Sequence, residues 1–163
     1  MATRSLVVDA GVWIDLANGG ILDLVFRLGY TVASPDLVVA EIKPPLERLD
    51  ELGLVVLELT GNQVLAVEKL AVENRHTSAI DLAAFIVARD SGGVLLTGDQ
   101  RLRRFAEARG LQARGVLWVL DEAIRLGLLH ETRAAGVLET IIDAGSRLPR
   151  SECEERLRRW RHA

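Results

Sequence analysis

The hydrophobic positions of the chain alternate between short apolar runs and longer segments with helical periodicity. The apolar runs are bounded by glycine or polar residues and predict strands at residues 6–8, 30–33, 54–59, 94–97 and 110–113. Helical spacing fills the intervals and predicts helices at residues 11–18, 21–28, 37–42, 46–52, 63–73, 78–89 and 99–109. Because strands separated by helices need crossover connections, we predict a three-layer α/β/α fold with a mostly parallel sheet of about five strands.

Two of these helices have distinctive sequence features. Residues 78–89 are apolar nearly all round, which is typical of a buried helix. The helix at residues 37–42 follows Pro35, and proline is tolerated in a first helical turn. Pro44 and Pro45 are expected to end it.

Three further helices, at residues 116–126, 131–143 and 151–161, follow the last expected strand and have no strand partners. A chain of 163 residues fits one domain, and we find no internal repeat or linker. We therefore expect a single domain over residues 1–163, with the C-terminal helices of residues 116–162 packed on it.

The composition excludes several classes of protein. Hydrophobic residues make up 49% of the chain, yet no uninterrupted apolar stretch approaches the roughly 20 residues of a membrane span. The first residues leave no room for a signal peptide before the strand at 6–8, so we expect a soluble, cytoplasmic protein. Cys153 is the single cysteine, so any metal must be held by oxygen rather than by a thiolate cluster.

Four acidic residues are expected to meet at the carboxyl edge of the predicted sheet. Asp9 ends the first strand and Asp99 follows the fourth, and right-handed crossovers bring the start of the helix with Asp81 to the same edge. Glu41 follows the second strand closely enough to lean over the same place. Carboxylates gathered there repel one another unless a divalent cation lies among them, and Mg²⁺ or Mn²⁺ suits such ligands.

Each acid also has a purely structural interpretation. Ser78 and Asp81 have the spacing of a helix capping box. Asp9 and Asp99 stand where helix N-caps belong, and Glu41 has the position of a solvated helix residue. Helix capping does not require that all the acids fall on one edge of the sheet, and this coincidence favours a functional site.

Four segments of the chain resemble motifs of PIN-domain nucleases. They are residues 7–15 (VVDAGVWID), 39–41 (VAE), 78–88 (SAIDLAAFIVA) and 95–99 (LLTGD). Residues 115–157 also resemble a subgroup of small prokaryotic PIN proteins that are often encoded beside an antitoxin. The resemblance covers essentially the whole chain and implies a VapC-like toxin ribonuclease that depends on Mg²⁺ or Mn²⁺.

This resemblance also implies roles for particular residues. Asp9, Glu41, Asp81 and Asp99 are expected to bind the metal ions that activate water for attack on an RNA phosphodiester. Thr97 is expected to support these acids by hydrogen bonding. An antitoxin protein and a second copy of the chain are the implied partners. Apolar residues near the N-terminus could form the homodimer interface or belong to the core: Trp13, Ile14, Leu22 and Phe26.

Two features of the sequence depart from the family pattern. Gly11 stands where family members often carry serine, threonine or asparagine, and Arg101 and Arg103 stand where many have a further acid. Arg101, Arg103 and Arg104 follow Asp99 directly, and we predict that they contact RNA phosphates, with a solvated helix face as the alternative. The net charge of -3 argues against bulk electrostatic binding, so such contacts would be local.

Two other functions compete with the nuclease interpretation. A haloacid-dehalogenase-like phosphatase would also use an aspartate at the end of the first strand. It needs a second aspartate two residues later, where Gly11 stands, and a catalytic lysine, and Lys43 and Lys69 are the only lysines. The other alternative is a PIN-like module that binds RNA or a protein partner with weak catalysis or none. Metal-dependent cleavage of RNA separates these alternatives.

Overall fold

Five parallel strands form the central sheet of the computed structural model, which describes residues 3–42 and 46–163. The strands are β1 (Ser5–Val8), β2 (Thr31–Pro35), β3 (Val55–Leu57), β4 (Val94–Leu96) and β5 (Ala113–Arg114). Their order across the sheet is β3-β2-β1-β4-β5, and every neighbouring pair is parallel.

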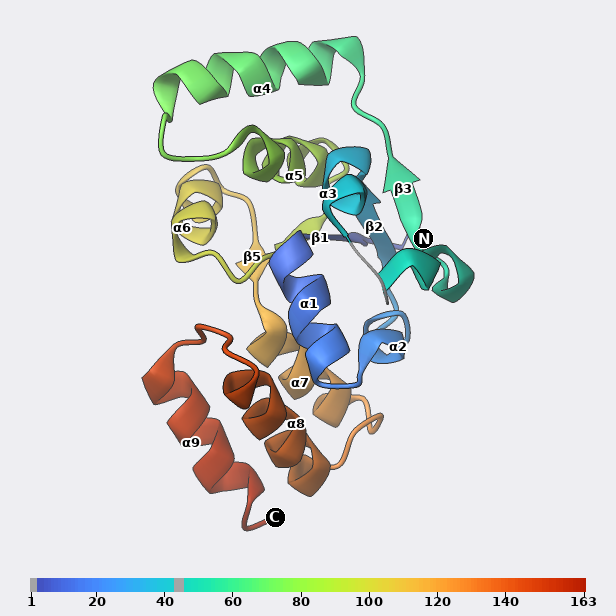
Figure 1. The fold of residues 1–163 in the computed structure, drawn as a ribbon, viewed down its shortest axis with the longest axis vertical. Coiled ribbons are helices and arrows are strands. Elements are labelled where there is room, and N and C mark those ends of the chain that lie inside the picture. Colours follow the sequence, from blue (N-terminus) through green and yellow to red (C-terminus); the bar gives the residue numbers. More distant parts are fainter. Residues whose placement is uncertain (1–2, 43–45) are drawn as a thin grey trace.

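Helices cover both faces of this sheet (Figure 1). α5 (Ala79–Asp90) lies on one face, with α4 (Gly61–Glu73) packed outside it and α6 (Gln100–Ala108) beside it. The opposite side carries α1 (Ala10–Asn18), α2 (Leu22–Val25), α7 (Val116–Arg125) and α8 (Glu131–Asp143), with α9 (Arg150–Trp160) against α8. α3 (Asp36–Glu41) follows β2, and a 3-10 helix (Leu46–Leu52) precedes β3. The predicted three-layer α/β/α fold is confirmed.

Strands β1 and β4 alternate their side chains between two hydrophobic cores. Leu6 and Val8 of β1 belong to the core on the side of α1 and α7, whereas Val7 belongs to the core under α5. In β4, Leu96 joins the first core and Leu95 the second. This period-two alternation, with both faces covered, explains why these strands read as continuous apolar runs in the sequence.

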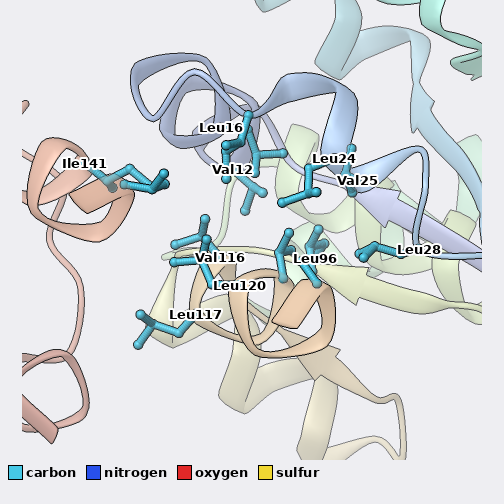
Figure 2. Close-up of a cluster of buried hydrophobic side chains, with 14 of the residues drawn as sticks. Val12, Leu16, Leu24, Val25, Leu28, Leu96, Val116, Leu117, Leu120 and Ile141 are labelled. Atoms are coloured by element: carbon cyan, nitrogen blue, oxygen red, sulfur yellow. The ribbon is translucent and has the colours of Figure 1, made fainter. Parts of the chain in front are cut away.

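The C-terminal helices contribute side chains to the first core. Figure 2 shows Val12 and Leu16 of α1 facing Val116 and Leu120 of α7, with Ile141 of α8 beside them. All five side chains are almost completely buried. The C-terminal helices are therefore packed on the sheet layer through α1 and α7. No helix in residues 3–42 and 46–163 is long and apolar enough to cross a bilayer.

The expected helix at residues 21–28 is the largest local difference from the sequence prediction. Only Leu22–Val25 is helical, because Gly29 adopts a φ of 89° that turns the chain into β2. The apolar positions that suggested a helix, Ile21, Leu24 and Leu28, are all buried in the first core. The expected helix end at Pro44 and Pro45 falls outside the described residues.

Two expected elements also differ in kind or position. The segment Leu46–Leu52 forms a 3-10 helix with non-helical backbone angles at Arg48, where an α-helix was expected. The fifth strand lies at Ala113–Arg114 because Leu95 donates its amide to Gln112 and Thr97 to Arg114, which fixes the pairing with β4.

The strand order creates a crevice at the carboxyl ends of β1 and β4. From β1 the chain moves to one side for β2 and β3, and then crosses to the other side for β4 and β5. The segments that leave β1 and β4 therefore diverge, and in open α/β sheets ligands bind outside the strand ends at such a switch point. Asp9 and Asp99 follow these two strands.

Candidate active site

Asp9 is held firmly at the end of β1. Its backbone amide donates to the Leu96 carbonyl (2.9 Å), and it is the N-cap of α1. Its Oδ1 accepts from the Ala10 amide (2.8 Å) and its Oδ2 from the Thr97 hydroxyl (3.0 Å). The side chain is buried, with 8% of the residue exposed. Burial raises the pKa of Asp9, the charges of Asp99 and Glu41 add to the rise, and the two hydrogen bonds oppose it.

Thr97 links the two aspartates that follow the inner strands. Its side chain is fully buried, and its hydroxyl donates to Asp9 while accepting from the backbone amide of Asp99 (3.1 Å). Asp99 is in turn the N-cap of α6, because its Oδ1 accepts from the amides of Arg101 (2.8 Å) and Leu102 (3.2 Å). Both aspartates therefore cap helices and also face one crevice, so the two interpretations of each residue are compatible.

Asp81 and Glu41 approach the same place from two other helices. Asp81 lies in the first turn of α5, where its amide donates to the Ser78 hydroxyl (3.1 Å), one half of the predicted capping box. Burial, followed by the charge of Asp9, raises the pKa of Asp81 to about 6, with smaller contributions from Asp99 and Glu41. Glu41 is exposed at the end of α3. The structure thus brings the four acids within electrostatic range of one another.

A hollow of about 280 Å³ lies in front of Asp9 and Asp99. We call it the acid hollow, and its lining also includes Gly98, Ser146 and Arg147. Ser146 and Arg147 lie between α8 and α9, so the C-terminal part of the chain forms one wall of the crevice. Neither residue could be assigned to the site from the sequence, because no local pattern reveals which loop closes over the sheet edge.

Asp15 attaches that loop to α1. Only 8% of Asp15 is exposed, and burial raises its pKa while a hydrogen bond from Ser146 opposes the rise. A second buried network steadies the strand ends, since the Trp13 indole donates to the Ser34 hydroxyl (3.0 Å), which donates to the Val8 carbonyl (2.6 Å). These contacts fix the backbone immediately before Asp9.

The three arginines predicted to contact RNA have different surroundings. Arg101 and Arg104 are exposed on α6. Arg103 is partly buried, and its Nη2 donates to the carbonyl of Thr97 (3.3 Å). Arg103 is therefore attached to the end of β4, whereas the other two fit the solvated-face alternative as well as a phosphate contact.

Comparison with known proteins identifies the family. Residues 5–162 match the model of a family described as a PIN domain. The chain belongs to the PIN-domain family. The crystal structure of PAE2754 from Pyrobaculum aerophilum is similar with a TM-score of 0.55 and 25% sequence identity, covering 76% of this chain and 99% of that chain. A comparison with curated proteins found no match.

PIN domains are generally nucleases and typically use divalent metals, so the acids can be tested for their fit to such an ion. Within residues 3–42 and 46–163, no three Asp, Glu, His or Cys side chains are close enough to bind one ion together. Mg²⁺, however, usually keeps several waters and is bound through one or two carboxylates. The interacting carboxylates, with no ion pair to Asp9, Asp81 or Asp99 among the described residues, supply the right donor chemistry for this mode of binding.

Proposed function

We propose that this PIN domain is an endoribonuclease that depends on Mg²⁺ or Mn²⁺ and hydrolyses RNA phosphodiesters in the acid hollow. In this proposal Asp9, Glu41, Asp81 and Asp99 are the metal ligands, and each ion is held by one or two of these carboxylates together with water. The observation that carries the proposal is the mutual electrostatic effect of these acids at one sheet edge, where burial and neighbouring carboxylates raise the pKa values of Asp9 and Asp81. Helix capping alone would not require these four acids to lie near one another.

The chemistry divides between the cation and the protein. When bound, the cation supplies Lewis acidity that makes water a nucleophile near neutral pH and offsets charge on the phosphoryl oxygens. Thr97 fixes the orientation of the Asp9 carboxylate and the position of the Asp99 backbone. The Ala10 amide donates to Oδ1 of Asp9, and the amides of Arg101 and Leu102 both donate to Oδ1 of Asp99, which restricts the orientation of each carboxylate. The protein therefore presents ligands whose orientation is already set.

Arginine side chains near the acid hollow are proposed to bind the RNA backbone. Arg147 lines the hollow itself, and Arg101, Arg103 and Arg104 extend from α6 beside it. Guanidinium groups bind phosphate through paired N–H donors, and this attraction is independent of base sequence. The contacts would hold the strand without selecting its sequence.

The role in a toxin–antitoxin pair and the homodimer extend this proposal, and both rest on the family resemblance. Of the four apolar residues considered for a dimer interface, Trp13 is fully buried and stacks on Phe26 (ring centroids 5.8 Å apart), and Leu22 is partly buried. Ile14 is 52% exposed and lines the acid hollow. A dimer would therefore need another surface, and sedimentation at tens of micromolar protein tests for it.

The decisive experiment measures RNA cleavage by purified protein with Mn²⁺, with Mg²⁺ and with excess EDTA. We expect cleavage with either metal and none with EDTA. Asp9→Asn, Asp81→Asn and Asp99→Asn should each lower the rate at least about a hundredfold, because even groups that only support a metal ligand contribute about 10–100-fold. Asp143→Asn, which changes an exposed residue at the end of α8, is the matched control, and this variant should cleave RNA normally. Full activity in EDTA, or in all three site variants, would refute the proposal.

A second candidate is a PIN-like module that binds RNA with little or no turnover. It is favoured by the absence of a ready three-ligand arrangement within the described residues. In that case the protein would bind RNA in EDTA as tightly as with Mn²⁺, and the Asp9, Asp81 and Asp99 variants would bind as well as the original chain without any cleavage by either.

A further inference from the structure

A second hollow, of about 270 Å³, lies next to the acid hollow. We call it the arginine hollow, and it is lined by Arg103 of α6, Arg114 of β5, Gly115, Val116 and Leu117 at the start of α7, and Arg156 of α9. Gly98 and Leu148 line both hollows. A Cβ added at Gly98 would meet no atom within 4 Å, so the space beside this shared residue is open.

Two guanidinium groups in the arginine hollow have donors without acceptors. The Nε atoms of Arg103 and Arg114 are buried and make no hydrogen bond to any residue in the described part of the chain. Neither arginine forms an ion pair there. A buried charged donor without a partner is costly, so these N–H groups indicate a missing acceptor.

The acidic residues around the arginine hollow do not supply that acceptor. Asp121 is already bound by Arg156 (Nη2 to Oδ2, 2.7 Å), which cancels both charges. Glu107 and Glu152 also line the hollow, but both are exposed, and within the described residues neither carboxylate forms an ion pair with Arg103 or Arg114. The interior of the hollow therefore retains the positive charge of Arg103 and Arg114.

The start of α7 adds backbone donors to the same place. Its N-cap is Gly115, which has no side chain to cap the helix, and its first turn contains no acidic residue. The amides of Trp118 and Val119 both donate to the Gly115 carbonyl, which leaves those of Val116 and Leu117 ahead of the first intrahelical bond. Free amides and the positive end of the helix dipole favour an anion.

We propose that the arginine hollow binds a phosphate group of the RNA strand, next to the phosphodiester that is cleaved in the acid hollow. This inference rests on the proposed ribonuclease function. Oxygen atoms of the phosphate accept from the buried Nε–H groups of the partly buried Arg103 and Arg114 and from the amides at the start of α7. The strand crosses Gly98, so that consecutive parts of its backbone occupy the two hollows.

Glycine at position 115 makes room for this site. A Cβ at Gly115 would collide with Nη2 of Arg103, while its backbone has an extended φ of -128° that any residue can adopt. Glycine therefore fits position 115 because a side chain would take the space of the Arg103 guanidinium, and not because the backbone conformation requires glycine. Gly115→Ala should displace the guanidinium of Arg103 with little effect on the backbone.

The first experiment maps the site by NMR in EDTA, so that it does not depend on cleavage. The probes are inorganic phosphate and a hexauridylate, and the signals are the Nε–H groups of Arg103 and Arg114 and the amides of Val116 and Leu117. We expect both probes to shift these signals, with the hexauridylate acting at lower concentration. Unchanged Arg114 and Val116 signals with both probes would overturn the proposal. A response to phosphate alone would identify a site for a free anion and would equally overturn the RNA assignment.

The second experiment measures affinity for labelled hexauridylate in EDTA as salt is varied. Arg114→Gln should weaken binding about tenfold, and its salt slope should be smaller by about 0.7, the value of one lost phosphate contact on a single strand. Gly115→Ala should weaken binding in the same direction. Arg133→Gln and Gly136→Ala, both on exposed positions of α8, are the matched controls and should bind normally.

These outcomes separate this inference from the proposed function. If Arg114→Gln binds RNA with unchanged affinity and slope while Mn²⁺-dependent cleavage is present, the phosphate site is refuted and the nuclease stands. If the arginine signals respond to hexauridylate and no metal supports cleavage, the phosphate site stands and the nuclease falls. Circular dichroism and thermal melting of each variant confirm that it is folded.

Discussion

The acid hollow and the arginine hollow are neighbours with opposite electrostatic imbalances. At the acid hollow, burial and the neighbouring carboxylates raise the pKa values of Asp9, which lines the hollow, and of Asp81 near it. In the arginine hollow, buried N–H groups of Arg103 and Arg114 have no acceptor within the described residues. Each arrangement is unfavourable in the protein alone, and each is completed by a species of the opposite charge. Stability is commonly lower at sites arranged for binding, and the two ligands that we propose here are a cation and a phosphate.

The largest predicted effect is a reversal of stability order by Mn²⁺. In EDTA near pH 8, Asp81→Asn should melt at the same temperature as the original chain or higher, because it removes one of the clustered charges. Substitution of Asp81 gives a clearer test than substitution of Asp9, because both carboxylate oxygens of Asp9 accept hydrogen bonds that would also change. With Mn²⁺ at a hundred times its Kd, the original chain should gain about 2.7 kcal/mol, or roughly 5–10 °C in Tm, and exceed the variant.

Calorimetry of both proteins in both buffers checks this reversal. Asp143→Asn controls for loss of a negative charge elsewhere and should follow the original chain. If the acids act only as helix caps, Asn should replace Asp with little change and Mn²⁺ should shift neither protein. Identical melting curves in all conditions would therefore show that the acids do not form a cation site, and the acid hollow would no longer be the counterpart of the arginine hollow.

The second prediction concerns the hydroxyl of Thr97. Thr97→Val keeps the shape of the side chain but leaves Asp9 Oδ2 and the Asp99 amide without their shared partner. We expect cleavage to slow about 10–100-fold and unfolding in urea to show a loss of about 1–3 kcal/mol. Thr97→Ser retains the hydroxyl and should keep most of the activity. Equal rates for the Val and Ser variants would show that the hydroxyl has no part in orienting the acids.

The third prediction is a fall in stability between about pH 4 and pH 6 in EDTA. Below the ordinary value of 3.8, Asp81 is protonated in both folded and unfolded chains. Between 3.8 and about 6 the folded chain keeps a proton that the unfolded chain has released, so the free energy of unfolding falls as the pH rises. For this partly exposed group the expected decrease is about 1 kcal/mol.

Urea unfolding at several pH values measures this decrease. Asp81→Asn should remove it, so that the difference between the original chain and the variant grows from pH 4 to pH 6 and then stays constant. A difference that is constant throughout the range would contradict the electrostatic coupling of Asp81 to the other acids.

The smallest predicted effect distinguishes the exposed Arg101 and Arg104 from the partly buried Arg114. Arg101→Ala and Arg104→Ala should each weaken RNA binding only about twofold, because interactions of exposed charges typically contribute about 0.2–1 kcal/mol. Arg114→Gln should weaken it several times more. Titration of labelled hexauridylate in parallel for the three variants makes the comparison. Losses as large for Arg101 and Arg104 as for Arg114 would place the main phosphate contact on the outer face of α6.

Much of the fold could be predicted because it depends on local pattern. Strands β1 and β4 are buried on both faces, so they are apolar runs in the sequence that predict strands. The apolar helix predicted at residues 78–89 is α5, in which Leu82 to Ala88 are buried. The helix expected at residues 21–28 was wrong in extent. Its apolar spacing reflects burial against the first core, while Gly29 and the entry to β2 determine the backbone. In that segment, apolar residues at helical spacing reflect burial, and this spacing cannot be told from that of a helix.

The candidate site was only partly accessible to sequence reasoning. The positions of Asp9 and Asp99 follow from strand ends, and the structure does place them beside one crevice, with Thr97 between them. Their role as metal ligands stays a prediction. The Ser146 to Leu148 wall and the arginine hollow could not be foreseen, because they depend on how α8, α9 and the edge strand β5 pack across long sequence separations. No local pattern encodes those distances.

The hydrogen bond between Thr97 and Asp9 joins residues 88 positions apart, and this separation has a consequence during synthesis. β4 must have emerged and paired with β1 before the two strand ends can form a crevice. At translation rates of about 5–20 residues per second, a growing chain carries Asp9 for roughly 5–20 s before Asp99 has been added. A fragment that ends before residue 97 holds at most three of the four acids and no Thr97. The proposed site is therefore assembled late, because the pairing of β4 with β1 must come first and the wall at Ser146 to Leu148 is added only near the end of the chain.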